Sequence, residues 1–176
     1  MNMIKDSFSW DKQYTSSLKV NDSNCQTPLS APPKISNWIQ LNSDGVVKES
    51  TGIATVGRIL RDKYGSWIIE YNRLVGTCSV LDADLWGIFE GVAIAINKGF
   101  DRILIISDSQ EAIQVIQGRV TKMSNSALVR RIILLLAEMS FWSIQHVPRD
   151  YNKEADSLAK MIVNNNGCIQ FFETPP

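Results

Sequence analysis

Four aspartates, far apart in the chain, stand where a purely structural explanation is weak. Asp84 lies inside the apolar stripe of a predicted helix, where an ionised carboxylate is costly to bury unless it is paired or bound to a metal. Asp44 and Asp108 each follow a predicted strand, and Asp156 flanks the apolar face of the last predicted helix. Carboxylates that meet repel each other. A divalent cation removes this repulsion, and oxygen ligands favour Mg²⁺ or Mn²⁺ over zinc.

Three of these aspartates also have a local explanation. Asp44 precedes Gly45, and Asp-Gly is a common turn pair. Asp108 could cap the helix that follows it, and Asp156 could be a solvated helix residue. Together, however, two strand-end and two helix carboxylates form a two-metal constellation that is more specific than any pair.

The elements that must position these aspartates follow from the hydrophobic periodicity. We expect strands at 38–42, 52–60, 66–75, 103–106 and 141–147, and helices at 80–97, 112–116, 126–139 and after Pro148. The first strand is predicted to end in a turn at Asp44 and Gly45, and residues 61–65 to form a hairpin turn. The continuous β-branched run at 103–106 is typical of a strand buried on both faces.

This order predicts an α/β fold. A hairpin meander followed by a βαβ crossover gives a five-stranded mixed sheet, three antiparallel strands and then parallel ones, with helices on both faces. In an open α/β sheet, ligands collect at the carboxyl ends of the strands, where Asp44 and Asp108 are expected.

Length and composition predict one globular domain with a polar tail. The chain has 176 residues, 44% of them hydrophobic, and 18 basic residues against 18 acidic ones. We predict a flexible N-terminal tail or linker at 1–35, a domain at 36–172 and a C-terminal tail at 173–176. Residues 36–176 have 14 basic and 15 acidic residues, so the domain does not hold nucleic acid by bulk charge.

Several classes of protein are disfavoured. Three widely spaced cysteines fit neither a disulfide framework nor a CxxC metal site, and the first residues carry charges where a signal peptide is apolar. The longest apolar run, 132–137, is far shorter than the roughly 20 residues that span a bilayer. We expect an intracellular monomer without membrane contact, in the nucleus or the cytoplasm.

Four segments resemble the successive motifs of ribonuclease H domains. They are Trp38-Ile-Gln-Leu-Asn-Ser-Asp-Gly45, Ala83-Asp-Leu-Trp-Gly87, Ser107-Asp-Ser109 and His146-Val-Pro-Arg-Asp-Tyr-Asn-Lys-Glu-Ala-Asp-Ser-Leu-Ala159. The resemblance covers about residues 36–172 and is nearest to the plant ribonuclease H-like group, which is related to the C-terminal domain of LINE-type retrotransposon reverse transcriptases.

The resemblance implies a metal-dependent endonuclease that cuts the RNA strand of RNA–DNA hybrids. Asp44, Asp84, Asp108 and Asp156 would then bind two Mg²⁺ ions. One ion would activate a water and the other would stabilise the leaving oxygen. The 2′-OH is the group by which a protein tells the two strands apart.

Two positions depart from the family pattern. Asp84 stands where the family has Glu, and a side chain shorter by one methylene can misplace the charge; a 1 Å error can cost about 10²-fold in rate. Arg58 stands where related sequences carry a second glycine, and could contact a phosphate or be an ordinary surface strand residue.

Three further polar residues have two readings each. His146 could assist the final proton transfer, because His is the usual proton carrier near neutral pH, although a packing role at the end of the last strand is the preferred reading. Gln110 and Asn152 match polar positions near the family's active site and could contact substrate, or could simply start helices.

Two other functions compete with the enzyme. A nucleic-acid-binding module that kept the fold and lost turnover is motivated by Asp84, Arg58 and the lack of excess positive charge. A small α/β interaction domain with coincidental carboxylates is the third reading.

Overall fold

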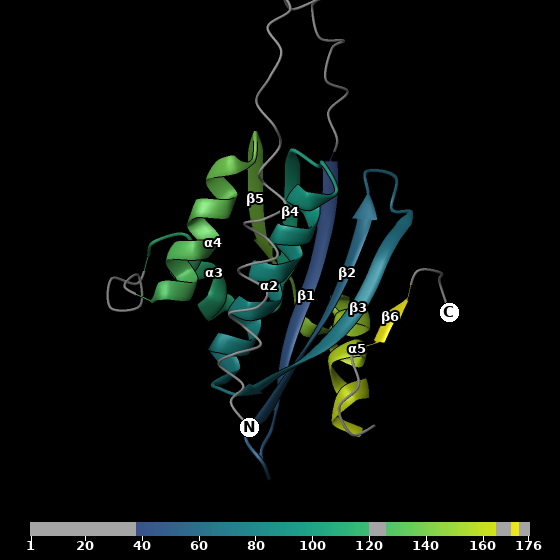
Figure 1. Ribbon diagram of the computed structural model, residues 1–176, viewed down its shortest axis with the longest axis vertical. Coiled ribbons are helices and arrows are strands. Elements are labelled where there is room, and N and C mark those ends of the chain that lie inside the picture. Colours follow the sequence, from purple (N-terminus) through teal and green to yellow (C-terminus); the bar gives the residue numbers. More distant parts are fainter. Residues whose placement is uncertain (1–37, 120–125, 165–169, 173–176) are drawn as a thin grey trace, which may run out of the picture. The chain divides into compact units, whose positions relative to one another are not determined.

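The computed structural model describes residues 38–119, 126–164 and 170–172 (Figure 1). The strands are β1 (Trp38–Lys48), β2 (Ile53–Asp62), β3 (Trp67–Thr77), β4 (Arg102–Ser107), β5 (Phe141–His146) and β6 (Gln170–Phe172). The helices are α2 (Val80–Asn97), α3 (Gln110–Ile116), α4 (Ala127–Glu138) and α5 (Lys153–Asn164), and the 3-10 turn η1 (Arg149–Tyr151) leads into α5. The expected tails at 1–35 and 173–176 lie outside the described residues, so the domain boundaries stay predictions.

The predicted mixed sheet is confirmed. Its strand order is β5-β4-β1-β2-β3-β6. β1, β2 and β3 pair antiparallel, whereas β1, β4 and β5 are parallel. The short strand β6 pairs with β3 and adds a sixth strand to the five that the sequence predicted.

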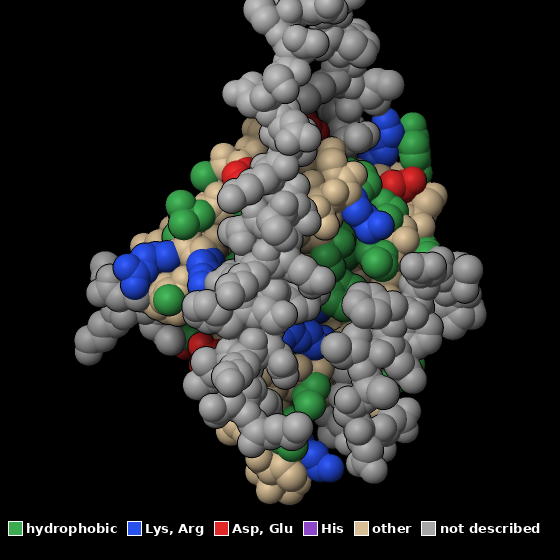
Figure 2. Space-filling model, in the orientation of Figure 1, with side chains coloured by type: hydrophobic (Ala, Val, Ile, Leu, Met, Phe, Trp, Pro, Cys, Tyr) green, Lys and Arg blue, Asp and Glu red, His purple; other side chains and the backbone are tan. Residues whose placement is uncertain are grey.

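Helices pack on both faces of the sheet, and two glycines set how closely they approach. A Cβ on Gly45 would lie 2.7 Å from the backbone N of Asp84 in α2, and a Cβ on Gly57 would lie 2.3 Å from the carbonyl O of Ala155 in α5. Because Gly57 pairs with Asp44 and not with Gly45, α2 and α5 lie on opposite faces. On the face that Figure 2 shows, the described Lys and Arg side chains are dispersed and form no single basic patch.

The turn predicted at Asp44 and Gly45 is wrong. β1 continues through both residues to Lys48, and Asp44 pairs with Gly57 of β2. The glycine is required by the close approach of α2, not by a turn. Pairing of β1 with β4 does end at Asn42, so Asp44 still lies just beyond the carboxyl end of the parallel part of the sheet.

The expectation that the strand at 103–106 is buried on both faces is also wrong. In β4, buried residues alternate with half-exposed ones, and the buried set includes Ile103 and Ile105. The physical reason is that α5 packs against β1, β2 and β3, so on the α5 side β4 has less cover than a fully enclosed strand.

Two smaller features agree with local chemistry. α2 begins at its N-cap Ser79, whose hydroxyl accepts a hydrogen bond of 3.1 Å from the Asp82 N–H, and is followed by Gly99 at φ +82°. In the described part of the chain, no helix has the length and apolar character needed to cross a membrane.

Candidate active site

The structure brings the four aspartates together from four elements. Asp44 lies in β1, Asp108 directly after β4, Asp84 in the second turn of α2 and Asp156 in the first turns of α5. Asp44 and Asp84 are only 4% and 5% exposed, and the Asp108 and Asp156 side chains 13% and 14%. The result is a largely buried acidic cluster just beyond the carboxyl end of the parallel pairing of β1 with β4.

Asp44 is the most perturbed member of this cluster. Burial, followed by the negative charges of Asp108 and Asp84, raises the pKa of Asp44 to about 8. Asp44 Oδ2 is also buried without a hydrogen-bond partner. Burial and the neighbouring carboxylates therefore disfavour the ionised form of Asp44.

Asp84 is held against β1 by its own hydrogen bonds. Asp84 Oδ1 accepts a bond of 3.0 Å from the Gly45 N–H, and the nearby Ser109 side chain also favours the ionised carboxylate. Burial raises the pKa of Asp84 to about 6, although both interactions oppose the shift. In the absence of metal, these interactions thus orient the short Asp84 side chain and offset part of the cost of burying its charge.

Asp156 is paired with two cations. Lys160 Nζ lies 2.5 Å from Asp156 Oδ2, and Arg149 donates a bond of 3.0 Å to Asp156 Oδ1. Burial opposes ionisation, but these bonds and charges prevail and lower the pKa of Asp156. Arg149 also lies 3.9 Å from Asp108.

Sequence reasoning gave Arg149 no role. The available signal was a single arginine between His146 and Asp156 in the fourth motif, but only the fold shows that it reaches two of the carboxylates.

Asn152 connects the cluster to β1 and does not face solvent. Its side-chain amide lies within donor distance of the Ser43 carbonyl (3.0 Å) and Asp108 Oδ1 (3.4 Å), and it accepts a bond of 3.2 Å from Asn42. Asn152 is 1% exposed, and its amide positions Asp108 and the start of α5; the expected substrate contact stays a prediction.

His146 and Gln110 are both exposed. The His146 Nε2 lies 3.2 Å from the Asp108 carbonyl oxygen, so the ring is tethered beside the cluster at the end of β5; its packing and catalytic roles both stay predictions. Gln110 is the first residue of α3, two residues after Asp108. Both remain candidates for contact with a ligand.

Arg58 is neither a phosphate ligand nor a surface residue. It is fully buried, donates a bond of 2.9 Å from Nε to the Gly87 carbonyl, pairs with Glu90, and lies 4.6 Å from the Tyr71 ring centroid. Glu90 also pairs with Arg73. Arg58 therefore belongs to a buried ion triad that joins β2 and β3 to α2.

The donor set of the cluster fits a hard divalent cation. Carboxylate oxygens are the ligands that Mg²⁺ prefers, and the unpartnered, buried Asp44 Oδ2 is an oxygen that a cation would satisfy. In the described residues, the side chains as placed do not form a group of three or more His, Cys, Asp or Glu ready to hold an ion. Arg149 and Lys160 instead neutralise Asp156.

Comparisons with known proteins agree with this geometry. Residues 42–162 match the family model described as reverse transcriptase-like. A protein of Arabidopsis thaliana named for ribonuclease H is 32% identical over 79% of the chain, and ribonuclease HI of Halobacterium salinarum is 30% identical over 66%. The chain spans 23% and 59% of these two relatives' own lengths.

Solved structures show the same fold. The crystal structure of RNase H1 from Halobacterium salinarum superposes with a TM-score of 0.66 at 28% identity, covering 73% of this chain and 98% of that one. The N-terminal RNase H domain of a Mycobacterium tuberculosis protein has a TM-score of 0.67 at 20% identity, covering 74% and 96%. A compost-derived RNase H1, solved in complex with an RNA/DNA hybrid, has a TM-score of 0.65 at 19% identity, covering 72% and 97%.

Proposed function

Since the chain belongs to the reverse transcriptase-like family of ribonuclease H domains, we propose that it hydrolyses the RNA strand of RNA–DNA hybrids with the help of divalent metal ions. The observation that carries the proposal is the convergence of four aspartates from four elements, with Asp44 Oδ2 buried and without a partner. A carboxyl group whose pKa is raised to about 8 by burial and two neighbouring carboxylates costs stability when ionised, and such arrangements are found where a cation is meant to bind.

Asp44, Asp84, Asp108 and Asp156 are the residues that would hold Mg²⁺, with Mn²⁺ as a substitute. Two such ions, when bound, supply the charge that activates a water and stabilises the leaving 3′ oxygen in a phosphodiester hydrolysis. The binding of two ions and the assignment of all four carboxylates as ligands are both part of what we propose.

The remaining residues of the site orient the carboxylates and supply protons. Asn152 fixes Asp108 from the start of α5, and Gly45 fixes Asp84 through its N–H. His146 is near enough to the Asp108 backbone to carry a proton at the edge of the site. Arg149 balances the charge of Asp108 and Asp156.

The second candidate is a nucleic-acid-binding module without turnover. Two observations favour it: Asp84 is shorter than the usual Glu, and both Asp156 oxygens are engaged by Arg149 and Lys160. A monomeric state, a nuclear or cytoplasmic location and a retrotransposon origin also remain predictions.

One assay separates the candidates. The full chain is incubated with a labelled RNA–DNA hybrid in Mg²⁺ and in Mn²⁺, beside an Asp108→Asn variant. We expect cleavage of the RNA strand by the unaltered chain and none by the variant. If the unaltered chain cleaves in neither metal but still retards the hybrid in a gel, the binding module replaces the enzyme; if it does neither, both proposals fail.

A further inference from the structure

In the part of the chain that the structure describes, no helix covers one half of the sheet on the side where α5 packs. Among the described residues, α5 contacts β1, β2 and β3, whereas β4 contacts β1, β5 and α2, and β5 contacts β4 and α3. On the α5 side, β4 presents Arg102, Leu104 and Ile106, all half-exposed, while the alternate residues are buried. We call the surface made by β5, β4 and the start of β1 the open sheet face.

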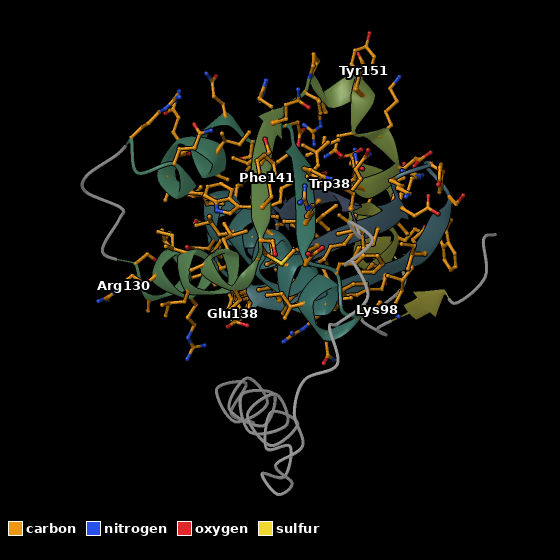
Figure 3. The ribbon with its side chains drawn as sticks, turned by 90° about the horizontal axis from the view of Figure 1, so that it is seen from above. Trp38, Lys98, Arg130, Glu138, Phe141 and Tyr151 are labelled. Atoms are coloured by element: carbon orange, nitrogen blue, oxygen red, sulfur yellow. The ribbon has the colours of Figure 1, made fainter. Side chains whose placement is uncertain are left out.

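Its amino-terminal end is aromatic. Trp38 pairs with Arg102, and Arg102 pairs with Phe141, so the three side chains stand in one row across the strands. The Trp38 and Phe141 rings lie 5.1 Å apart at 59°, and Phe141 is 47% exposed. Figure 3 shows these two residues next to one another, with Arg130 and Glu138 of α4 on the far side of the sheet.

The row also carries a cation, Arg102. The Arg102 guanidinium lies 5.8 Å from the Trp38 ring centroid, and its Nε is buried without a hydrogen-bond partner. No described carboxylate forms an ion pair with it. A guanidinium beside one aromatic ring, with a second, exposed ring next to it, suits a ligand that combines a negative charge with flat rings, which is the chemistry of a nucleotide strand.

The open sheet face leads directly to the candidate active site. Gln40, Asn42 and Asp44 follow Trp38 on the same side of β1, and Gln40 and Asn42 are hydrogen-bonded to each other. At about 3.3 Å per residue, Trp38 lies roughly 20 Å from Asp44. Between them, Gln40 and Asn42 line a polar hollow of about 290 Å³ together with Tyr151 and Asn152.

From this continuity we propose that the open sheet face binds a single-stranded stretch of nucleic acid adjoining the hybrid in the candidate active site. Phe141 and Trp38 would stack on bases, Arg102 would pair with a phosphate, and the Gln40 amide would contact the strand on its way to the carboxylates. The proposal rests on the proposed function for the position of the hybrid, but it concerns binding and not cleavage.

The test compares a blunt RNA–DNA hybrid with hybrids that carry a single-stranded RNA overhang at the 5′ or the 3′ end. An overhang of about eight nucleotides lies within the site sizes of known single-strand binders. Affinities are measured with the full chain by fluorescence anisotropy in Ca²⁺, which is chosen to allow binding while suppressing cleavage. We expect one of the two overhangs to tighten binding about tenfold, as one stacked base and one phosphate contact would give.

Two pairs of variants locate the effect. Phe141→Ala and Arg102→Gln should reduce the gain from the overhang to twofold or less. Trp142→Ala removes a neighbouring exposed aromatic residue of β5 from the opposite face, and Lys98→Gln removes an exposed cation after α2; both controls should keep the tenfold gain. Thermal unfolding of each variant verifies that it is folded.

Photocrosslinking gives a readout that does not depend on a variant. An overhang with 5-iodouridine should crosslink to Trp38 or Phe141, as located by mass spectrometry. The proposal is overturned if blunt and overhanging hybrids bind equally, or if the crosslinks map elsewhere, as they would if another part of the chain covers this face. Loss of cleavage with the overhang gain intact would refute the proposed enzyme alone.

Discussion

At the scale of single residues, the charge of Asp44 links stability to pH. In the unfolded chain its carboxyl ionises near pH 3.8, whereas in the folded chain its pKa is about 8. Between these values the folded state holds a proton that the unfolded state has lost, so the free energy of unfolding must fall as pH rises from about 4 to about 8. Asp84, with a pKa of about 6, adds to the fall below pH 6.

We predict that, in EDTA, the chain loses about 2–4 kcal/mol of stability between pH 5 and pH 8 through Asp44. Urea denaturation at the two pH values measures it. The Asp44→Asn variant should lose clearly less, because its side chain does not titrate. Equal losses in both proteins would contradict the assignment, and Mg²⁺ at pH 8 should restore stability only to the unaltered chain.

A second prediction concerns the reach of Asp84. Its carboxylate is drawn back onto the Gly45 N–H at 3.0 Å, so an added methylene should carry the charge further toward Asp44 and Asp108. We expect Asp84→Glu to raise the cleavage rate in Mg²⁺ about tenfold or more, since small errors of placement are costly. Single-turnover rates measure the change; an unchanged rate would show that the shorter side chain already suffices.

For single residues, the sequence predicted the acidic cluster but not the environment of Arg58. The acidic type and order of the four aspartates predicted which side chains would meet, because carboxylates in apolar stripes and at strand ends are hard to explain otherwise. Arg58 could not be placed in this way. Its burial depends on an ion pair with Glu90, which lies 32 positions further along the chain. No local sequence pattern predicts so distant a partner.

At the scale of elements, the distance between α5 and β2 controls the position of Asp156. A methyl group at Gly57 would lie 2.3 Å from the Ala155 carbonyl and 2.5 Å from the Ala159 N, both backbone atoms that move only with the helix. We predict that Gly57→Ala costs at least about 3 kcal/mol and lowers cleavage about 10²-fold. Denaturation and rate measurements check the two effects.

Gly99→Ala is the matched control. Gly99 has a φ of +82° with open space around it, so a methyl group adds backbone strain of about 1 kcal/mol without a clash. Cleavage by this variant should equal that of the unaltered chain. If both glycine variants lost activity equally, close packing of α5 would not be the cause.

The ion triad that joins β2, β3 and α2 gives a fourth prediction. Glu90→Gln leaves Arg58 charged, fully buried and without its counter-ion, which should cost about 3–5 kcal/mol. The double variant Arg58→Met, Glu90→Gln removes the buried charge as well and should be more stable than Glu90→Gln alone. The urea midpoints of the two variants measure this difference. A lower midpoint for the double variant than for Glu90→Gln would refute the interpretation.

Element positions were largely predictable, and element environments were not. Periodicity predicted α2 over Val80–Asn97 and α4 to within a residue at each end, because each helix has its own apolar stripe. The course of β1 beyond Asp44 depends on its pairing with β2, and the half-exposed face of β4 depends on where α5 packs. Both are tertiary facts that a local run of residues does not encode.

At the scale of the whole molecule, a chain with no net charge and an acidic site would have to bind a negatively charged hybrid. The chain has 18 basic and 18 acidic residues, and four of the acids gather where the phosphate backbone of a hybrid is proposed to lie. Two divalent ions add a charge of +4 and would reverse the sign of the local field. Affinity for the hybrid should therefore depend on the metal more than on bulk electrostatics.

We predict that Ca²⁺ tightens binding of a blunt RNA–DNA hybrid at least about tenfold relative to EDTA, and that a small number of phosphate contacts gives a shallow dependence on salt. The effect of Asp108→Asn on affinity for the hybrid should have opposite signs with and without metal. Without metal it has one negative charge fewer and should bind more tightly than the unaltered chain, whereas in Ca²⁺ it has lost a ligand and should bind more weakly. Anisotropy titrations of both proteins at two salt concentrations reveal whether the affinities cross. Affinities that keep the same order with and without metal would mean that the carboxylates do not couple ion binding to the substrate.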